Sequence, residues 1–200
     1  MRAHGVACMS IGFLVPEDTP MIWRGPMVQS ALQQMLGDVL WGELYVLVVD
    51  MPPGTGDAQL TMAQKVPLAG AVIVSTPQDI ALLDARKAIN MFRKVDVPIV
   101  GLVENMSYYC CPNCGHTEHI FGAGGGEKMC EQYGVPFLGS LPLNLSIREQ
   151  ADSGRPTVVA DPDGAIAGVY KQIARRVAIA VAEKAKDMTS KFPSIVVQNT

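Results

Sequence analysis

Two cysteines separated by two residues are the clearest chemical signal in this sequence. The string Cys110-Cys111-Pro112-Asn113-Cys114-Gly115-His116 places the thiols of Cys111 and Cys114 in one turn, where both can bind a soft metal. Two thiolates make half of a four-cysteine site, so the other ligands must come from elsewhere in the chain or from a symmetric second copy. Cys8 and Cys130 are not spaced as a second pair, and Cys8 is expected to be a core residue.

The residues of the turn allow other chemistry as well. The same ligands suit Zn²⁺, with His116 or His119 as possible further ligands. A thioredoxin-like redox pair is disfavoured, because that motif opens a helix near the start of a βαβ unit and this one lies in a Gly-rich segment. Cys110 is expected to be a bystander, because the side chains of neighbouring residues point apart.

A carboxylate follows an apolar run in the first third of the chain. In Val48-Val49-Asp50-Met51-Pro52-Pro53-Gly54-Thr55-Gly56-Asp57, Asp50 is placed to position Mg²⁺, and Gly54 would let its N–H approach a phosphate. The alternative is that Asp50 caps a turn and Gly54 serves a positive φ. Asn105 follows a later apolar run and on its own is most simply interpreted as a turn residue.

Strand and helix patterns alternate around these residues, and they predict a mostly parallel, doubly wound α/β sheet. Ligands in such sheets bind beyond the carboxyl ends of the strands. Strands are predicted at 6–15, 44–49, 70–75, 97–103 and 136–141. Helices are predicted from Pro26, over 82–92, over 126–133 and from Ile166, with a long loop at 105–126. The domain is expected to span residues 1–187, followed by a tail at 188–200.

The composition and charge of the chain argue against several classes of protein. The 200 residues are 48% hydrophobic and carry a net charge of −3, which argues against a nucleic-acid-binding surface. No apolar run approaches the roughly 20 residues that cross a bilayer. The five cysteines are an odd number and clustered, which favours metal or redox chemistry in a reducing compartment over a disulfide framework.

Several strings together resemble the Mrp/ApbC branch of the MinD-like deviant-Walker P-loop ATPases. The segment Asp50–Asp57 is similar to the Walker B and switch II segment of that family. Further similar strings cover residues 6–180: Met9–Val15, Trp23–Met27, Val74–Asp79, Glu104–Ser107, His119–Gly122, Leu141–Leu143 and Ile147–Glu149.

The resemblance implies an iron–sulfur cluster carrier that binds a [4Fe–4S] cluster on Cys111 and Cys114 at a homodimer interface and delivers it to apo-proteins. It also implies Mg-ATP binding, with Asp50 in the catalytic role, Gly54 at the phosphates, and Asn105 and Pro142 at the adenine. The compartment implied is the cytoplasm, or the mitochondrial matrix in a eukaryote. Alternatives are a zinc-stabilised interaction module without catalytic activity and a MinD-like positioning ATPase.

One family feature is not found in the sequence. A Gly-rich loop with Lys beside Ser or Thr is not present, because the run Gly122–Lys128 has no Ser or Thr after its Lys. We therefore expect the first strand and the P-loop of the family to be absent from this chain. That loop supplies most of the grip on a triphosphate, so we expect weak ATP binding by the chain alone.

Overall fold

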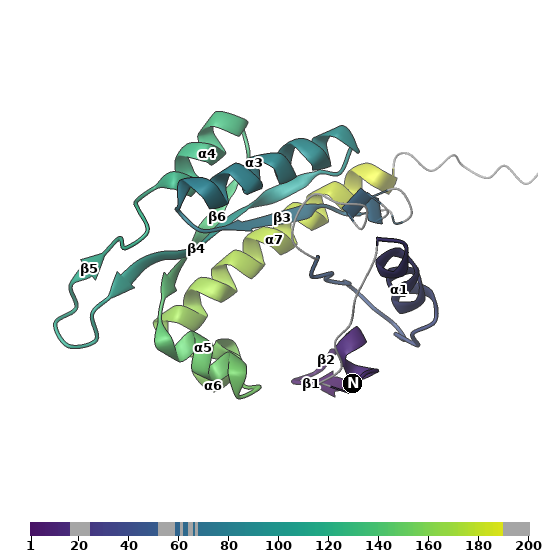
Figure 1. Ribbon diagram of the computed structural model, residues 1–200, viewed down its shortest axis with the longest axis horizontal. Helices are drawn as coiled ribbons and strands as arrows, with labels where there is room; N and C mark the ends of the chain where they lie inside the picture. The colour runs from purple at the N-terminus through teal and green to yellow at the C-terminus, as the bar shows by residue number, and fades with distance from the viewer. Residues whose placement is uncertain (17–24, 52–58, 61, 64–65, 67, 190–200) are drawn as a thin grey trace, which may run out of the picture. The chain divides into compact units, whose positions relative to one another are not determined.

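The computed structural model describes residues 1–16, 25–51, 59–60, 62–63, 66 and 68–189 (Figure 1). Its contacts cluster into two compact units, Met1–Pro67 and Leu68–Thr200. Each unit has its own helices and strands.

The first unit contains little regular structure among its described residues. Strands β1 (Arg2–Ala3) and β2 (Val6–Ala7) form a short antiparallel hairpin, followed by the 3-10 helix η1 (Ile11–Phe13) and by helix α1 (Gly25–Gly37). The helix predicted from Pro26 is confirmed. The strand predicted over 6–15 is wrong beyond Ala7, because the Ser10 hydroxyl accepts a hydrogen bond from the Gly12 N–H at 3.2 Å and begins a turn of helix instead.

The strand predicted at 44–49 is also wrong. These residues belong to no strand, and Leu44, Tyr45, Val46, Leu47 and Val48 are all exposed. A strand requires neighbours for its N–H and C=O groups as well as an apolar sequence. None of the described strands pairs with this run, so its hydrophobicity alone does not make it a central strand.

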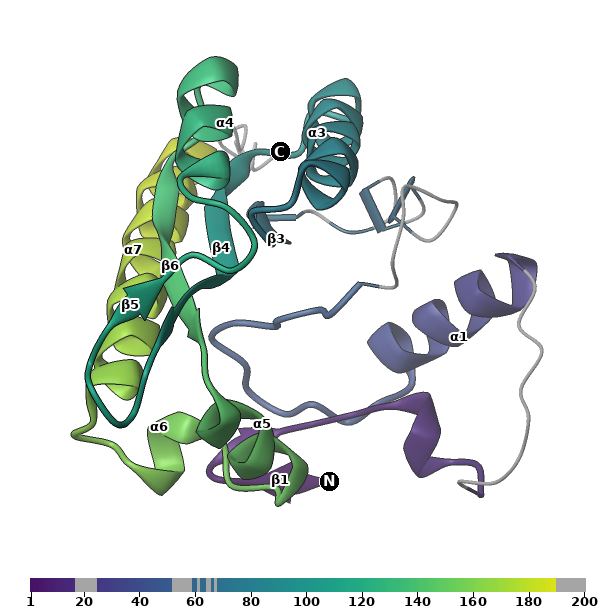
Figure 2. The same ribbon diagram turned by 60° about the vertical axis from the view of Figure 1, so that its left-hand side comes forward.

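The second unit is built on three parallel strands, as predicted. Strand β4 (Ile99–Cys110) lies between β3 (Ala71–Ser75) and β6 (Phe137–Leu143), and both neighbours run parallel to it. The predictions at 70–75, 97–103 and 136–141 are confirmed in position. Figure 2 shows β4 and β6 side by side.

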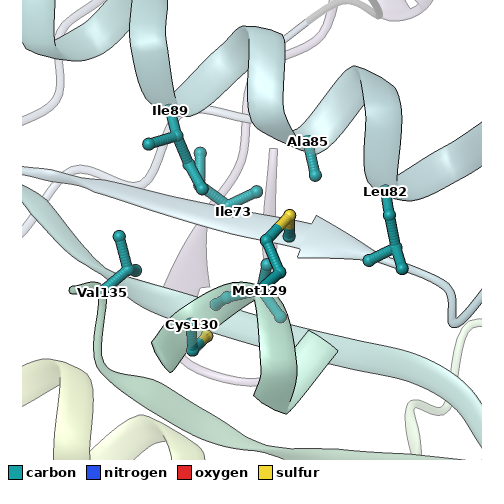
Figure 3. Packing of buried hydrophobic residues seen from close by; sticks show 8 residues of the cluster. Ile73, Leu82, Ala85, Ile89, Met129, Cys130 and Val135 are labelled. Carbon is teal, nitrogen blue, oxygen red and sulfur yellow. The ribbon is translucent and has the colours of Figure 1, made fainter. Parts of the chain in front are cut away.

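Two helices cover one face of this sheet. Helix α3 (Asp79–Lys94) connects β3 to β4, and helix α4 (Gly125–Tyr133) precedes β6. The predicted apolar stripe of α3 is confirmed, with Leu82, Ala85 and Ile89 buried. Figure 3 shows these side chains packed over Ile73 and against Met129, Cys130 and Val135.

One long helix covers the other face. Helix α7 (Ala165–Thr189) packs Val169, Tyr170, Ile173 and Val177 on a core cluster from β4 and β6 (Figure 1). Helices α5 (Leu145–Asp152) and α6 (Thr157–Ala160) lead from β6 to α7. The Arg176 guanidinium donates to the Leu138 carbonyl at 2.7 Å, which ties α7 to β6.

The loop predicted at 105–126 is wrong in its first part. Strand β4 continues to Cys110, and the two-residue strand β5 (Thr117–Glu118) returns antiparallel to it. The polar residues of 105–110 form a strand because β5 and β6 both pair with them. The hairpin of β4 and β5 extends away from α3 and α7 (Figure 1).

Candidate metal centre on the cysteine hairpin

The turn between β4 and β5 brings Cys111 and Cys114 together. Tyr109 pairs with Glu118 and Cys110 with Thr117, and the chain reverses between these pairs. The Cys111 N–H donates to the His116 carbonyl at 2.9 Å, and the Gly115 N–H donates to the Cys111 carbonyl at 2.9 Å. Gly115 has a φ of +71°, which a glycine adopts without strain. The expectation that the two thiols share one turn therefore agrees with the local geometry.

Hydrogen bonds in the turn favour a thiolate at Cys111. The backbone N–H groups of Cys114 and Asn113, followed by the Cys114 thiol, lower the pKa of the Cys111 thiol below its ordinary value of 9.0. A thiolate is the form that binds metals. Cys114 is exposed, so a metal bound at this turn is open to solvent and to another protein.

The other cysteines are placed differently. Cys130 is buried on α4, and burial, together with the carboxylates of Glu104 and Glu127, raises the pKa of its thiol to about 11. Cys8 is exposed in the first unit, so its prediction as a core residue is wrong. The Cys110 thiol is exposed and lies 3.6 Å from the Gly115 carbonyl.

The described residues supply only two ligands at this turn. Among them there is no group of three His, Cys, Asp or Glu side chains that could hold a metal ion. His119, a possible zinc ligand by sequence, has its Nδ1 atom 2.9 Å from the Ser107 carbonyl, and His116 is exposed. A complete site at this turn would need further ligands beyond those that the described residues place there.

Asn105 and Pro142 lie on adjacent strands at an irregularity in the sheet. Glu104 is opposite Ser140 and Tyr108 is opposite Pro142, so three residues of β4 face a single residue of β6. The Asn105 Oδ1 atom accepts a hydrogen bond from the Met106 N–H at 2.9 Å, and Met106 has a φ of +53°. The two predicted adenine contacts thus lie on neighbouring strands, where Pro142 is opposite Tyr108, and Pro142 is buried.

The predicted phosphate and magnesium residues belong to the other unit. Asp50 is exposed, and Gly54 lies outside the described residues. Their roles remain predictions.

Sequence reasoning missed the buried residue Glu104. This residue is 1% exposed, and its carboxyl group accepts hydrogen bonds from the Gly126 N–H at 2.6 Å and the Ser107 hydroxyl at 2.5 Å. The one available signal was an acidic residue directly after a continuous apolar strand. A cavity of about 330 Å³ lies at the opposite end of β4, lined by residues that include Arg93, Pro98 and Gly134, and it contains none of the predicted site residues.

Comparison with known proteins places these features in context. Residues 1–178 match the ParA family, in the description NUBPL iron-transfer P-loop NTPase. An iron-sulfur cluster carrier protein of Pseudomonas fragi is 61% identical over 174 residues, which cover 87% of this chain and 61% of that protein. The iron-sulfur cluster transfer protein NUBPL of Dictyostelium discoideum is 52% identical over 199 residues, covering 98% of this chain and 62% of that protein.

A solved structure is similar as well. The nucleotide-binding protein of Archaeoglobus fulgidus in complex with ADP aligns with a TM-score of 0.60 at 38% identity, over 69% of this chain and 56% of that chain. This chain therefore spans about three fifths of the length of the Pseudomonas and Dictyostelium relatives. No helix in the described part of the chain is long and apolar enough to cross a membrane.

Proposed function

Because this chain belongs to the ParA family of NUBPL-type iron-transfer P-loop NTPases, we propose that it is an iron–sulfur cluster carrier. The cluster is its cargo, bound by the thiolates of Cys111 and Cys114 and delivered to apo iron–sulfur proteins. The names of the Pseudomonas and Dictyostelium relatives, a cluster carrier and a cluster transfer protein, support this proposal.

The observation that carries the proposal is the hydrogen-bonded turn at Cys111. Its N–H donors lower the pKa of the Cys111 thiol, which favours metal binding, while the exposure of Cys114 suits a cargo that must leave again. The turn offers two thiolates and a cubane cluster is held by four. We therefore propose that two copies of the chain share one [4Fe–4S] cluster across a two-fold axis.

Nucleotide binding is the second part of the proposal. The ADP bound to the Archaeoglobus relative supports it. We assign Asp50 to the Mg²⁺ ion in the catalytic role, Gly54 to the phosphates, and Asn105 and Pro142 to the adenine. We place the carrier in the cytoplasm of a bacterium or the mitochondrial matrix of a eukaryote.

Anaerobic reconstitution with ferrous iron and sulfide tests cluster binding. The wild-type chain should turn brown and sediment at twice the mass of the apo form. Cys111→Ala and Cys114→Ala should abolish both changes, because each removes half of the ligands that one chain contributes. Cys8→Ala and Cys110→Ala are matched controls that should behave as wild type.

Two results would contradict the proposal. If Cys130→Ala, checked for folding by circular dichroism, removed the cluster as completely as Cys111→Ala, the ligand assignment would be wrong. If the purified chain carried stoichiometric zinc and could not be reconstituted, the zinc-stabilised interaction module would replace the carrier. A cluster on a monomer would refute only the shared site.

A further inference from the structure

Four residues outside the cysteine turn are joined by hydrogen bonds. The Glu104 carboxyl group accepts from the Gly126 N–H on α4 and from the Ser107 hydroxyl, and the Ser107 carbonyl bonds His119 Nδ1 at 2.9 Å. A carbonyl only accepts, so Nδ1 of His119 must carry the proton. These contacts connect α4, β4 and the segment that comes after β5.

The same residues enclose the irregular stretch of β4. The pairing of β4 with β6 shifts between Glu104 and Tyr108, and Met106 between them has a positive φ. Extra residues of this kind bend a strand and redirect the chain beyond them. The chain beyond this bend forms the hairpin with Cys111 and Cys114, so the bend sets the direction in which the thiols leave the sheet.

Both sides of the bend are held. Glu104, at the start of the bend, is 1% exposed, and its carboxyl group accepts from the Gly126 N–H at the amino end of α4. The same carboxyl group accepts from the hydroxyl of Ser107, the last residue of the bend. His119 fixes the returning arm of the hairpin to Ser107. Strand β5 contributes only two residue pairs, and this side-chain contact adds a link between the returning arm and β4 beyond them.

We infer that Glu104 and His119 are positioning residues that orient the cysteine hairpin through Ser107. The effect of these residues on a bound cluster rests on the proposed function, whereas their effect on the position of the hairpin does not. A residue that only stabilised the fold would affect the whole second unit. A positioning residue changes the hairpin and the metal bound there, and leaves the helix-covered core unchanged.

Hydrogen–deuterium exchange on the apo protein tests the hairpin. In His119→Ala, amides of 108–118 should exchange roughly 2- to 10-fold faster, which is the effect of about one hydrogen bond. In His119→Asn the rate should return toward wild type, because the carboxamide can donate as Nδ1–H does. His116→Ala is the matched control, since it keeps the backbone carbonyl that accepts from Cys111. Amides of 129–138 should be unchanged in all three.

The Glu104 arm needs its own variants. Ser107→Ala removes the hydroxyl and keeps the carbonyl, and it should also accelerate exchange in 108–118. Glu104→Gln should stay near wild type, because its oxygen can accept from Gly126 while its nitrogen donates to the Ser107 hydroxyl. Equal exchange in wild type, His119→Ala and Ser107→Ala would overturn the inference.

Loss of a reconstituted cluster to a chelator tests the consequence for the cargo. His119 holds the hairpin through the Ser107 carbonyl and does not touch either thiol, so His119→Ala should lose its cluster roughly 2- to 10-fold faster, the effect of about one hydrogen bond. If the wild type takes no cluster, the proposed function fails and the exchange result still decides the role of His119. If clusters bind and their loss is unchanged in His119→Ala, the positioning role for the cargo is wrong.

Discussion

Cys111 and His116 face each other across the tight turn of the hairpin, where the Cys111 N–H donates to the His116 carbonyl at 2.9 Å. This contact closes the turn and leaves the N–H groups of Cys114 and Asn113 directed at the Cys111 sulfur, where they lower the pKa of its thiol. The pKa of the Cys111 thiol is therefore lowered mainly by backbone N–H groups, with the Cys114 thiol as a further contributor.

A first prediction concerns the reactivity of the native thiols. Cys111 should be alkylated by iodoacetamide faster than Cys130 at neutral pH, because the pKa of its thiol is lowered while that of the buried Cys130 thiol is raised to about 11. Peptide mass spectrometry after a short pulse measures both. Equal labelling of the two in the folded apo protein would contradict the assignment, and equal labelling in denaturant is the control.

Stability should fall at alkaline pH because of Cys130. The folded thiol keeps its proton up to about pH 11, while the unfolded thiol loses it near 9.0, so the unfolded state gains relative stability as the pH rises between these values. The contribution is fully present below pH 9. Urea unfolding of wild type and Cys130→Ala from pH 7 to 11 should show a smaller decline in the variant. Parallel curves would refute the prediction.

Gly126 should not tolerate a side chain. A Cβ atom there would lie 2.7 Å from the Glu104 Oε2 atom and 3.1 Å from the Leu102 Cδ2 atom. Gly126→Ala should lower the free energy of unfolding by about 1–3 kcal/mol, the usual cost of overpacking. Gly168→Ala on α7 is the matched control, because its Cβ would meet nothing within 4 Å, and it should be neutral or stabilising. Denaturant unfolding that ranked the two variants the other way would contradict the packing described.

The 200-residue chain should bind Mg·ATP weakly. Most attraction for a triphosphate comes from clustered backbone N–H groups and a Lys at a helix amino end, and its sequence contains no Gly-rich loop with Lys beside Ser or Thr. Isothermal titration should detect no sub-micromolar binding, with Mg·GTP as the comparison for base selectivity. Sub-micromolar affinity would contradict this prediction. If that affinity were reduced in Asp50→Ala and Asn105→Ala, the nucleotide would lie at the proposed residues, and if it were unchanged, the phosphate site would lie elsewhere in the chain.

The sequence allowed prediction of the features that depend on neighbouring residues. The strands at 70–75 and 97–103 are continuous apolar runs, and the stripe on α3 recurs at helical spacing, so each carries its own signal. The cysteine turn is equally local. The run at 44–49 has the same apolar character but forms no strand. A strand also needs a partner segment to pair with, and the residues of the run do not reveal whether one is present.

Long-range contacts account for the features that the sequence did not predict. Glu104 and Gly126 are separated by 22 residues, and no local pattern links a carboxyl group to a distant amide. The sequence of residues 105–110 is typical of a loop, and these residues form a strand only because β5 and β6 pair with them. Within the Gly122–Gly126 run, Gly125 and Gly126 allow close packing of α4, since a Cβ at Gly125 would lie 2.9 Å from the Pro77 carbonyl oxygen and one at Gly126 would lie 2.7 Å from the Glu104 Oε2 atom.

The amino end of α4 already holds its own ligand. A helix start rich in glycine is a common docking place for phosphate, because its N–H groups point outward without partners. In this unit the Glu104 carboxyl group sits there, buried and attached to the same chain. A phosphate arriving from solution would have to displace a tethered competitor whose effective concentration far exceeds its own. The glycine-rich start of α4 therefore already binds a carboxylate of its own chain, and we do not expect a nucleotide phosphate to bind there.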